Sequence, residues 1–174
     1  MTEIIQNGNK TLRKIAKEVS ISDVKTPKIK KIISDMSDAL DSQLDGVAIA
    51  APQIDISLRI FTVSGKVFDP DFIDGRTNKR SEEYPNIVFI NPKIKKISKD
   101  KKLMDEGCLS VRPFFGKVRR ATRVTVEAYN ENGEKFEMEG VGLLAHIFQH
   151  EYDHLDGILF IDKAKDVREI YTEQ

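Results

Sequence analysis

The residues best suited to chemistry form the run His150-Glu151-Tyr152-Asp153-His154. On a helix, His150 and His154 stand one turn apart on the same face, where both imidazoles can reach one divalent ion. Glu151 lies beside that face, and its carboxylate can accept a proton from water at the ion and return it later. The pattern therefore predicts water activation at a metal. A histidine pair at this spacing also occurs on solvated or core helix faces, so a third ligand is required.

Cys108, the only cysteine of the chain, supplies the third ligand in this hypothesis. It stands in Glu106-Gly107-Cys108-Leu109-Ser110, a short glycine-containing segment that can aim a thiolate at an ion. A small buried hydrophobic side chain is the alternative role for a lone cysteine. Two imidazoles and one thiolate leave a coordination position open, as a catalytic site requires and a structural site does not.

A β-hairpin and a helix must position the histidines. Val124, Val126 and Ala128 alternate with polar residues, and Asn132-Gly133 follows as a turn, so we expect a hairpin that resumes at 136–138. After the hairpin the apolar residues recur at helical spacing, at Val141, Leu144, Ala145, Phe148 and Leu155, with Gly157 as the stop. The histidines then lie on an amphipathic helix whose apolar face is anchored in the core.

The first half of the chain contains one clear helix and two short strands. The helix begins near Thr26-Pro27, with threonine as N-cap and proline at the first helical position, and ends before Gly46. Its apolar stripe consists of Ile29, Ile32, Ile33, Met36, Ala39 and Leu40. Residues 58–63 and 87–90 are β-branched runs that predict strands, and the polar segment 69–86 predicts a surface loop. We expect an α+β fold, with antiparallel sheets packed around a central metal-binding helix, as one domain over residues 1–174.

Length and composition fit a single compact enzyme. A chain of 174 residues can bury a core large enough to hold a rigid site. Lysine plus arginine equals aspartate plus glutamate at 28 each, so no global field favours DNA or an anionic membrane. One cysteine forms no internal disulfide, and residues 1–10 do not read as a signal peptide. We expect a cytoplasmic protein without a membrane partner or specific DNA.

A third segment predicts a function only when it is considered together with the two metal-binding motifs. Residues 46–53, Gly46-Val47-Ala48-Ile49-Ala50-Ala51-Pro52-Gln53, are small enough to allow close backbone approach to a ligand and end in an amide side chain. Taken alone, the segment fits a tight helix-to-strand connection better than a ligand site. Together with the other two segments it predicts one wall of a substrate groove, with the Gln53 amide placed to donate to a developing oxyanion.

These three segments resemble, in order, the motifs of the peptide deformylase family, whose members remove the formyl group from the starting methionine of new bacterial proteins. The family patterns G-x-G-x-A-A-x-Q, E-G-C-L-S and Q-H-E-x-D-H stand here at residues 46–53, 106–110 and 149–154. The resemblance runs from Leu12-Arg13 to Phe160, nearly the whole chain. It implies hydrolysis of N-formyl-methionyl nascent peptides with release of formate.

The resemblance also implies roles for individual residues. Cys108, His150 and His154 would bind the ion, Glu151 would be the general acid and base, and Gln53 with the backbone amide of Leu109 would hold the oxyanion. The implied cofactor is one divalent ion, Fe²⁺ in the cell, whereas a purified sample could contain Zn²⁺ or Ni²⁺ because one sulfur and two nitrogens suit several borderline metals.

Substrate and supporting residues follow from the same resemblance. Val47, Leu143 and Ile147 would line the methionine slot, and the backbone around Gly46, Ala48 and Leu109 would approach or pair with the extended peptide. Glu106 would pair with Arg120 and so fix the Cys108 loop, although a solvated surface role for Arg120 fits the sequence equally well.

Several positions depart from the family pattern or remain open. Ala48 replaces the second motif glycine and adds a methyl group to the groove wall. His146 lies one turn before His150; as a fourth ligand it would close the site, so we expect a pocket-rim or structural histidine. Residues 112–117 offer two aromatics and two cations near the groove mouth. Asp153 could accept a hydrogen bond in the helix region, although the default expectation is an exposed helix acid. The sequence does not determine whether residues 166–171 extend a terminal helix.

Two other classes of protein share part of this sequence pattern, an H-E-x-x-H metallopeptidase and a non-enzymatic binding module. An H-E-x-x-H metallopeptidase would use His150, Glu151 and His154, but usually with a histidine or carboxylate as third ligand, and nothing in it explains residues 46–53. The basic run at residues 93–102 could make a transient contact with ribosomal RNA. Lysines that protect an exposed strand edge from aggregation account for the run at least as well.

Overall fold

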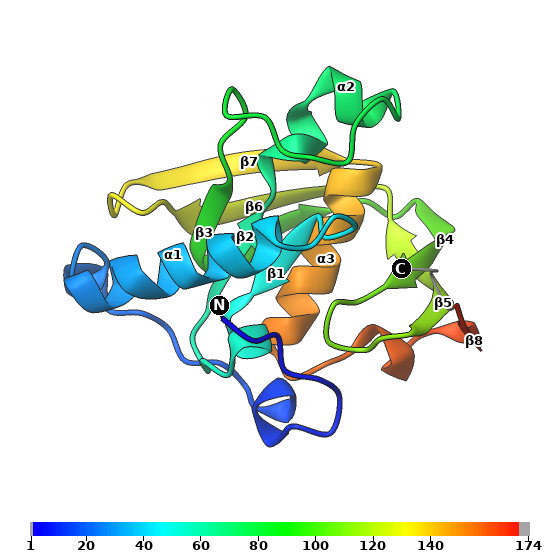
Figure 1. Cartoon of the computed structure of the whole chain (residues 1–174), viewed down its shortest axis with the longest axis horizontal. Helices are drawn as coiled ribbons and strands as arrows, with labels where there is room; N and C mark the ends of the chain where they lie inside the picture. Colours follow the sequence, from blue (N-terminus) through cyan, green and yellow to red (C-terminus); the bar gives the residue numbers. More distant parts are fainter. Residues whose placement is uncertain (1, 171–174) are drawn as a thin grey trace.

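Two antiparallel sheets and two longer helices make up the computed structural model, which describes residues 2–170 (Figure 1). The larger sheet has the strand order β1-β2-β3-β6-β7 and the smaller one β4-β5-β8. The strands are β1 Ala48–Ala50, β2 Ile60–Val63, β3 Ile87–Ile97, β4 Lys101–Gly107, β5 Phe114–Ala121, β6 Arg123–Tyr129, β7 Lys135–Val141 and β8 Lys165–Glu169. The helices are α1 Pro27–Asp41, α2 Pro70–Ile73 and α3 Leu143–Leu155, with 3₁₀ turns η1 Lys10–Arg13, η2 Ile21–Asp23, η3 Ala51–Ile54, η4 Gly65–Phe68 and η5 Phe160–Asp162. The predicted α+β class is confirmed.

Helix α1 forms where its sequence predicts it. The Thr26 hydroxyl accepts a hydrogen bond from the backbone N–H of Ile29, and Pro27 occupies the first turn, where its missing donor costs nothing. All members of the predicted stripe are buried except Ile33, which is half-buried, and the stripe packs with residues of β1, β2 and β3. Burying each isoleucine or leucine contributes about 1.5–3 kcal/mol, so packing holds this helix more than its cap does.

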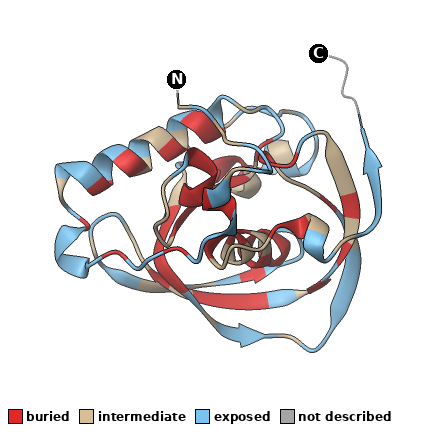
Figure 2. Ribbon diagram, turned by 90° about the horizontal axis from the view of Figure 1, so that it is seen from below, coloured by how far each residue is buried: buried red, intermediate tan, exposed pale blue. Residues whose placement is uncertain are grey.

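Helix α3 lies at the centre of the molecule, between the two sheets (Figure 1). Ala145, Phe148 and Leu155 are buried on its sheet-facing side, and the Phe148 ring lies 5.2 Å from that of Phe89 in an edge-on arrangement. Figure 2 shows the helix end-on, with its buried residues enclosed by the strands. Gly157, at φ +73°, follows the helix in a conformation that glycine adopts without strain. The predicted helix is confirmed, and its apolar face anchors the histidines.

The predicted hairpin is also confirmed. Strands β6 and β7 pair in antiparallel register with Val126 opposite Met138, and the inward residues Val124, Val126 and Ala128 are buried against the core. At the turn, the Asn130 side chain accepts hydrogen bonds from the backbone N–H groups of Asn132 and Glu134. Val141, which was assigned to the helical stripe, instead ends β7 and is exposed, because the change of period comes at Gly142 rather than at Gly140.

Three segment boundaries differ from their predictions. Strand β2 begins at Ile60 instead of residue 58, and the predicted loop 69–86 contains the short helix α2. Strand β3 continues to Ile97, since its first half pairs with β2 and its second half pairs with β6 across a register shift. The apolar run at residues 87–90 thus predicted only the first, buried half of β3 and missed its second half.

The sequence left open whether residues 166–171 form a terminal helix, and the described part of this segment is not helical; Tyr171 lies outside the described residues. Most of the described residues of this segment belong to β8, Lys165–Glu169, which pairs with β5 in antiparallel register. The reason is tertiary: β5 offers an open row of backbone donors and acceptors, and a charged, exposed tail satisfies them as an edge strand.

Candidate active site

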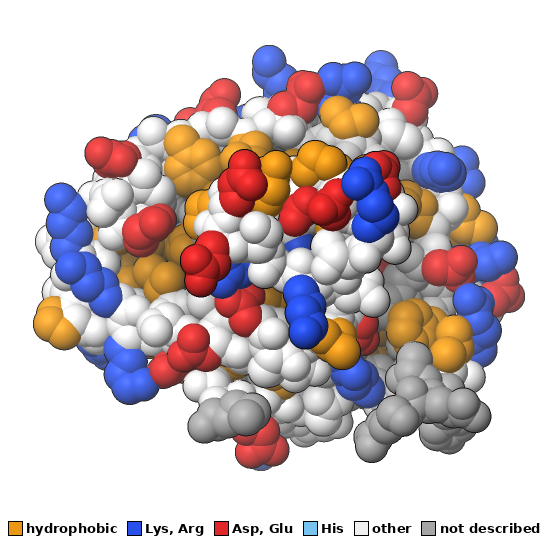
Figure 3. All heavy atoms as spheres, turned by 45° about the horizontal axis from the view of Figure 1, so that its top comes forward, with side chains coloured by type: hydrophobic (Ala, Val, Ile, Leu, Met, Phe, Trp, Pro, Cys, Tyr) orange, Lys and Arg blue, Asp and Glu red, His pale blue; other side chains and the backbone are white. Residues whose placement is uncertain are grey.

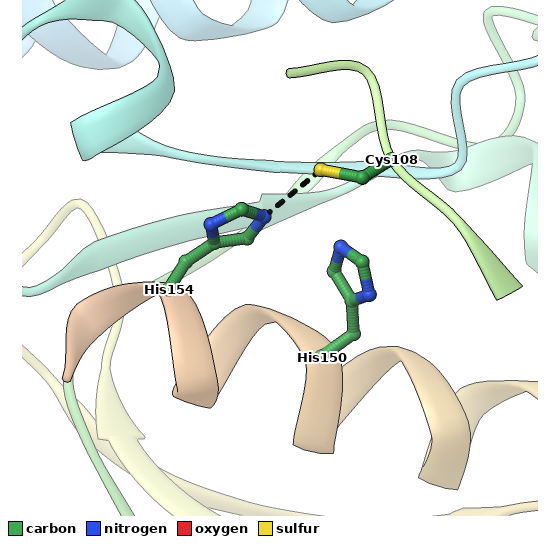
Figure 4. Close-up of side chains that lie close together, drawn as sticks. All are labelled: Cys108, His150 and His154. Carbon is green, nitrogen blue, oxygen red and sulfur yellow. Dashed lines mark hydrogen bonds between the residues drawn. The ribbon is translucent and has the colours of Figure 1, made fainter. Parts of the chain in front are cut away.

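Cys108 and the two motif histidines converge although they come from different elements. Cys108 directly follows β4, whereas His150 and His154 lie one turn apart on α3 (Figure 4). One ligand atom from each of the three side chains lies within 4.8 Å of the other two. The Cys108 sulfur is 3.2 Å from Nε2 of His154, and the two imidazole centroids are 4.9 Å apart.

This donor set fits a divalent metal ion. A thiolate and two imidazoles match the borderline preferences of iron, zinc or nickel, and three protein donors leave room for a substrate or a water molecule. The group is nearly closed to solvent on the helix side, where the His154 side chain is buried and the His150 side chain is 11 % exposed. Burial, together with the neighbouring His150, lowers the pKa of His154, so this imidazole is a neutral lone-pair donor.

Glu106 connects the cysteine loop to α3. Its carboxylate is buried; Oε1 accepts a hydrogen bond from Nδ1 of His150 at 2.5 Å and another from Arg120 Nη2 at 2.7 Å. Burial opposes the charge of Glu106, but hydrogen bonds from His146, His150 and Arg120 hold the pKa of this carboxyl well below its usual range. Because Nδ1 of His150 is committed to Glu106, its Nε2 is left to face the cysteine.

Arg120 extends this network to the outer side of α3. The arginine is 4 % exposed, which excludes the solvated surface role, and its Nη1 donates to Asp153 Oδ2 at 2.6 Å. Lys163 also donates to Asp153, at 2.9 Å. The expectation that Asp153 is an exposed helix acid is therefore wrong, because the buried arginine draws its carboxylate, only 13 % exposed, inward.

Glu151 is buried on the same helix, and its Oε2 has no hydrogen-bond partner within residues 2–170. Burial raises the pKa of this carboxyl to about 7, despite the opposing effect of His150. A carboxyl that titrates near neutrality can both accept and donate a proton. An unpaired buried oxygen is costly for folding, and such a cost typically persists where function requires it.

The Gln53 amide is held in one orientation beside Cys108. Its Oε1 accepts from the backbone N–H of Ala50 at 2.8 Å, so its Nε2 is directed to the Ser110 hydroxyl at 3.1 Å and the Cys108 sulfur at 3.6 Å. Ser110 was not among the predicted site residues. It is fully buried, and its backbone N–H donates to the Cys108 sulfur at 3.5 Å. Its place in the E-G-C-L-S motif was the available signal.

A cavity of about 370 Å³ opens beside these residues. The walls include every predicted substrate position, namely Gly46, Val47, Ala48, Leu143 and Ile147, and also Gln53, Leu109 and Glu151. Ala48 has no positive φ, so the methyl group that replaces the motif glycine is accommodated without backbone strain. Four residues of the 112–117 stretch, Arg112, Pro113, Phe114 and Phe115, line the cavity, whereas its second cation, Lys117, does not.

Comparison with known proteins agrees with this geometry. A family model described as Polypeptide deformylase matches residues 1–169. The chain belongs to the polypeptide deformylase family. Deformylases depend on a metal ion, and the Cys108, His150 and His154 cluster is a site able to hold one.

Individual relatives cover nearly the whole chain. It is 37% identical over 169 residues to peptide deformylase 1 of Ralstonia nicotianae, covering 97% of this chain and 89% of the relative. With peptide deformylase of Desulfitobacterium hafniense it shares 40% identity over 164 residues, 94% of each chain. A class I type b peptide deformylase structure from Acinetobacter baumannii superposes with a TM-score of 0.80 at 32% identity, covering 94% of this chain and 98% of that one. No finding supports the metallopeptidase alternative.

Two further observations concern helix hydrophobicity and surface charge. None of the helices within residues 2–170 has both the length and the apolar character of a membrane span. On the face shown in Figure 3, acidic and basic side chains are interspersed rather than separated by sign, as the balanced composition leads one to expect.

Proposed function

We propose that Cys108, His150 and His154 hold the metal ion with which this deformylase removes the N-formyl group from the initiator methionine of nascent polypeptides. The observation that carries the assignment is the convergence of the three donors within 4.8 Å, at the wall of a cavity lined by Gln53 and Glu151. We assign this activity to one catalytic domain spanning residues 1–174.

Glu151 acts as the proton carrier in this proposal. A bound divalent ion lowers the pKa of water and polarises the formyl carbonyl, which is the chemistry that the side chains cannot supply alone. Glu151 takes the proton from the attacking water and gives it to the amine that leaves, so formate and a free amino terminus result. Its burial and its pKa near 7 support both halves of this role.

Gln53 and the backbone amide of Leu109 stabilise the negative charge that develops on the formyl oxygen. The bond from Ala50 to Gln53 Oε1 fixes which end of the amide faces the site, so its N–H group is available without reorientation. Leu109 follows Cys108 directly, and its carbonyl accepts from the Gln6 side chain at 2.9 Å, which restrains the loop. Preorganised donors of this kind stabilise charge most where water is excluded.

Substrate recognition is mostly through the main chain and the methionine. Val47, Leu143 and Ile147 offer an apolar slot in the cavity, and the backbone at Gly46, Ala48 and Leu109 pairs with the extended peptide. Only the first residue is common to all nascent chains, so a site that reads its side chain and otherwise the backbone accepts many proteins.

We assign Fe²⁺ as the ion in the cell, with Zn²⁺ or Ni²⁺ as the ions that a purified sample can contain. One sulfur and two nitrogen donors support all three metals, and a sulfur ligand makes an iron centre sensitive to oxygen. Preparation without oxygen is therefore part of the test.

The expected setting is the cytoplasm, where nascent chains emerge, and a transient ribosome contact would suit the substrate. The lysines of the 93–102 run are exposed along the end of β3 and the start of β4. Within the described residues β4 pairs with β5 alone, so Lys101 and Lys102 lie on an open sheet edge, and protection of this edge is the competing explanation. Replacing Lys99, Lys101 and Lys102 by glutamine should weaken cosedimentation with ribosomes at low salt if the contact exists. Unchanged cosedimentation would leave edge protection as their role.

The assigned activity is tested by formate release from a formyl-methionyl peptide, using iron-loaded protein prepared without oxygen. Formate should appear at a rate that a chelator abolishes and added Fe²⁺ restores. The matched unformylated peptide should remain intact, whereas cleavage of its peptide bonds would indicate a metallopeptidase. No formate from the iron-loaded protein would overturn the assignment.

A further inference from the structure

His146 is a buried histidine outside the predicted ligand set. It lies on α3 one turn before His150, and its side chain is 7 % exposed. Its Nε2 is hydrogen-bonded to Oε2 of Glu106, and its Nδ1 lies 3.3 Å from the Met104 sulfur. Both ring nitrogens are therefore occupied by contacts away from Cys108, which accounts for a histidine in this position without a fourth ligand.

Glu106 is held symmetrically by two imidazoles and one guanidinium. Oε1 accepts from Nδ1 of His150 and from Nη2 of Arg120, while Oε2 accepts from Nε2 of His146 and from Nε of Arg120. Each oxygen thus has one imidazole and one arginine N–H. If the His146 bond is removed, Oε2 keeps only the 3.1 Å contact to Arg120, and the carboxylate plane loses one of its four restraints.

The orientation of Glu106 determines that of His150. A carboxylate that accepts the Nδ1 proton of an imidazole fixes its tautomer and ring angle, and so aims the lone pair on its Nε2. Here the bond between Glu106 and His150 is 2.5 Å long, so a rotation of the carboxylate would be passed to the ring.

We propose that His146 is a positioning residue of the metal centre, which acts through Glu106 to hold His150 at the angle that the ion requires. This inference rests on the proposed metal site and adds a residue to it. His146 never touches the ion or the substrate carbonyl in this role. Its contribution is preorganisation, and its loss should speed release of the ion more than it disturbs the fold.

The decisive comparison is between His146→Gln and His146→Asn. The Nε2 of glutamine can occupy the place of the imidazole Nε2 and donate to Glu106, whereas asparagine is too short to reach it. The measurement is the rate at which a chelator removes Zn²⁺ from zinc-loaded protein, followed with a chromogenic indicator. Loss of a residue that orients a ligand typically costs 10–100-fold in metal affinity, and for a residue one step further out we expect about 5–10-fold faster release in His146→Asn. His146→Gln should release Zn²⁺ within about 2-fold of the wild-type rate.

Two controls separate positioning from packing. Met104→Leu removes the sulfur contact but leaves the bond to Glu106, so its release rate should match that of the wild type. A Co²⁺-substituted sample should show altered visible bands in His146→Asn and wild-type bands in His146→Gln, because those bands report ligand geometry. Thermal unfolding of the metal-free variants checks that each is folded.

The outcomes distinguish a positioning role of His146 from a purely structural one, and both from failure of the proposed metal site. Wild-type release from His146→Asn, or equal acceleration in the glutamine and asparagine variants, would overturn the positioning role. If wild-type protein takes up no Zn²⁺, the proposed centre itself fails, and the inference fails with it; that result differs from one in which wild type and variants bind and release the ion alike.

Discussion

The two sides of the site are held by different forces. Helix α3 is anchored by apolar packing, with Phe148 and Leu155 fully buried, and its histidines project from a rigid scaffold. Cys108 itself is half-buried, and its loop is restrained by hydrogen bonds from Gln53, Ser110 and the Glu106 network. Apolar packing sets global stability, whereas the polar restraints set the geometry of a few atoms. Changes to the packing residues of the helix should therefore lower the stability of the fold, and changes to the polar residues of the loop should weaken binding of the ion first.

The largest effect is expected at Glu151, which lies on α3 but is proposed to take part in catalysis rather than in packing. Glu151→Ala should lower formate release by about 10²–10⁴-fold, because it removes the only proposed proton carrier. The protein should stay folded and keep its metal, since Glu151 is not among the three proposed ligands. Metal content and turnover are to be measured on the same sample. Loss of the metal in this variant would contradict the assigned role.

The contribution of apolar packing on the helix side is tested at Phe148, in the middle of α3. Phe148→Ala should lower the free energy of unfolding by about 3–5 kcal/mol, because it leaves a cavity beside Phe61 and Phe89. Val141→Ala, at an exposed position, is the matched control and should change stability by less than about 0.5 kcal/mol. Urea unfolding of the metal-free proteins provides the measurement. A Phe148→Ala protein with wild-type stability would show that packing does not anchor this side.

The contribution of the polar restraints on the loop side is tested at Glu106. Glu106→Gln keeps the size of the side chain but removes its charge, so it no longer orients His150 as a carboxylate does. Metal affinity should fall by about 10–100-fold, as measured by competition with a chromogenic chelator. Arg13→Met, a distant surface change, serves as the affinity control. Equal affinities of Glu106→Gln and wild type would remove the distinction between the two sides.

The smallest effect concerns an exposed ion pair beyond the end of α3. A hydrogen bond from Arg13 lowers the pKa of Asp162, although partial burial opposes the shift. The folded-state pKa is depressed, so the pair stabilises the protein above the unfolded pKa near 3.8, and this contribution is lost as pH falls through the lower folded value. Arg13→Met should cost about 0.2–1 kcal/mol at pH 7 and progressively less in acid, measured by urea unfolding across that range. A constant difference at every pH would assign the cost to packing instead.

Local patterns were sufficient for the elements whose own sequence carries both a period and a boundary signal. Helix α1 has a cap, a proline and an apolar stripe, and the β6-β7 hairpin has alternation and an Asn-Gly turn, so both were predicted closely. Strand β3 was predicted only in part, because its second half gains its pairing from β6 and not from a continuous apolar run. The conformation of the tail was left open by the sequence, with a helix as one possibility, and it forms β8 because the open edge of β5 outweighs a weak local preference.

At the site, the motifs identified which residues take part and, through the family resemblance, one supporting pair, Glu106 with Arg120, but not the rest of the supporting network. Cys108, His150, Glu151, His154 and Gln53 were all named from spacing and residue type, and the structure brings them together. The motifs did not indicate that Arg120 is buried, that Asp153 is drawn inward, or that His146 bonds to Glu106. These contacts join residues 14 to 40 positions apart, and no local period encodes them.

The sequence by itself determined the chemistry, because a thiol, two imidazoles and a carboxylate at their spacings are properties of residue type and of helix geometry. Tertiary structure alone decided the electrostatics. Glu106 stays charged because Arg120 and two histidines donate hydrogen bonds to it, while burial raises the pKa of Glu151 to about 7, with no hydrogen bond to its Oε2 within the described chain. The same carboxyl group thus has opposite pKa shifts at two buried positions, and the difference lies in which donors the fold brings within hydrogen-bonding distance.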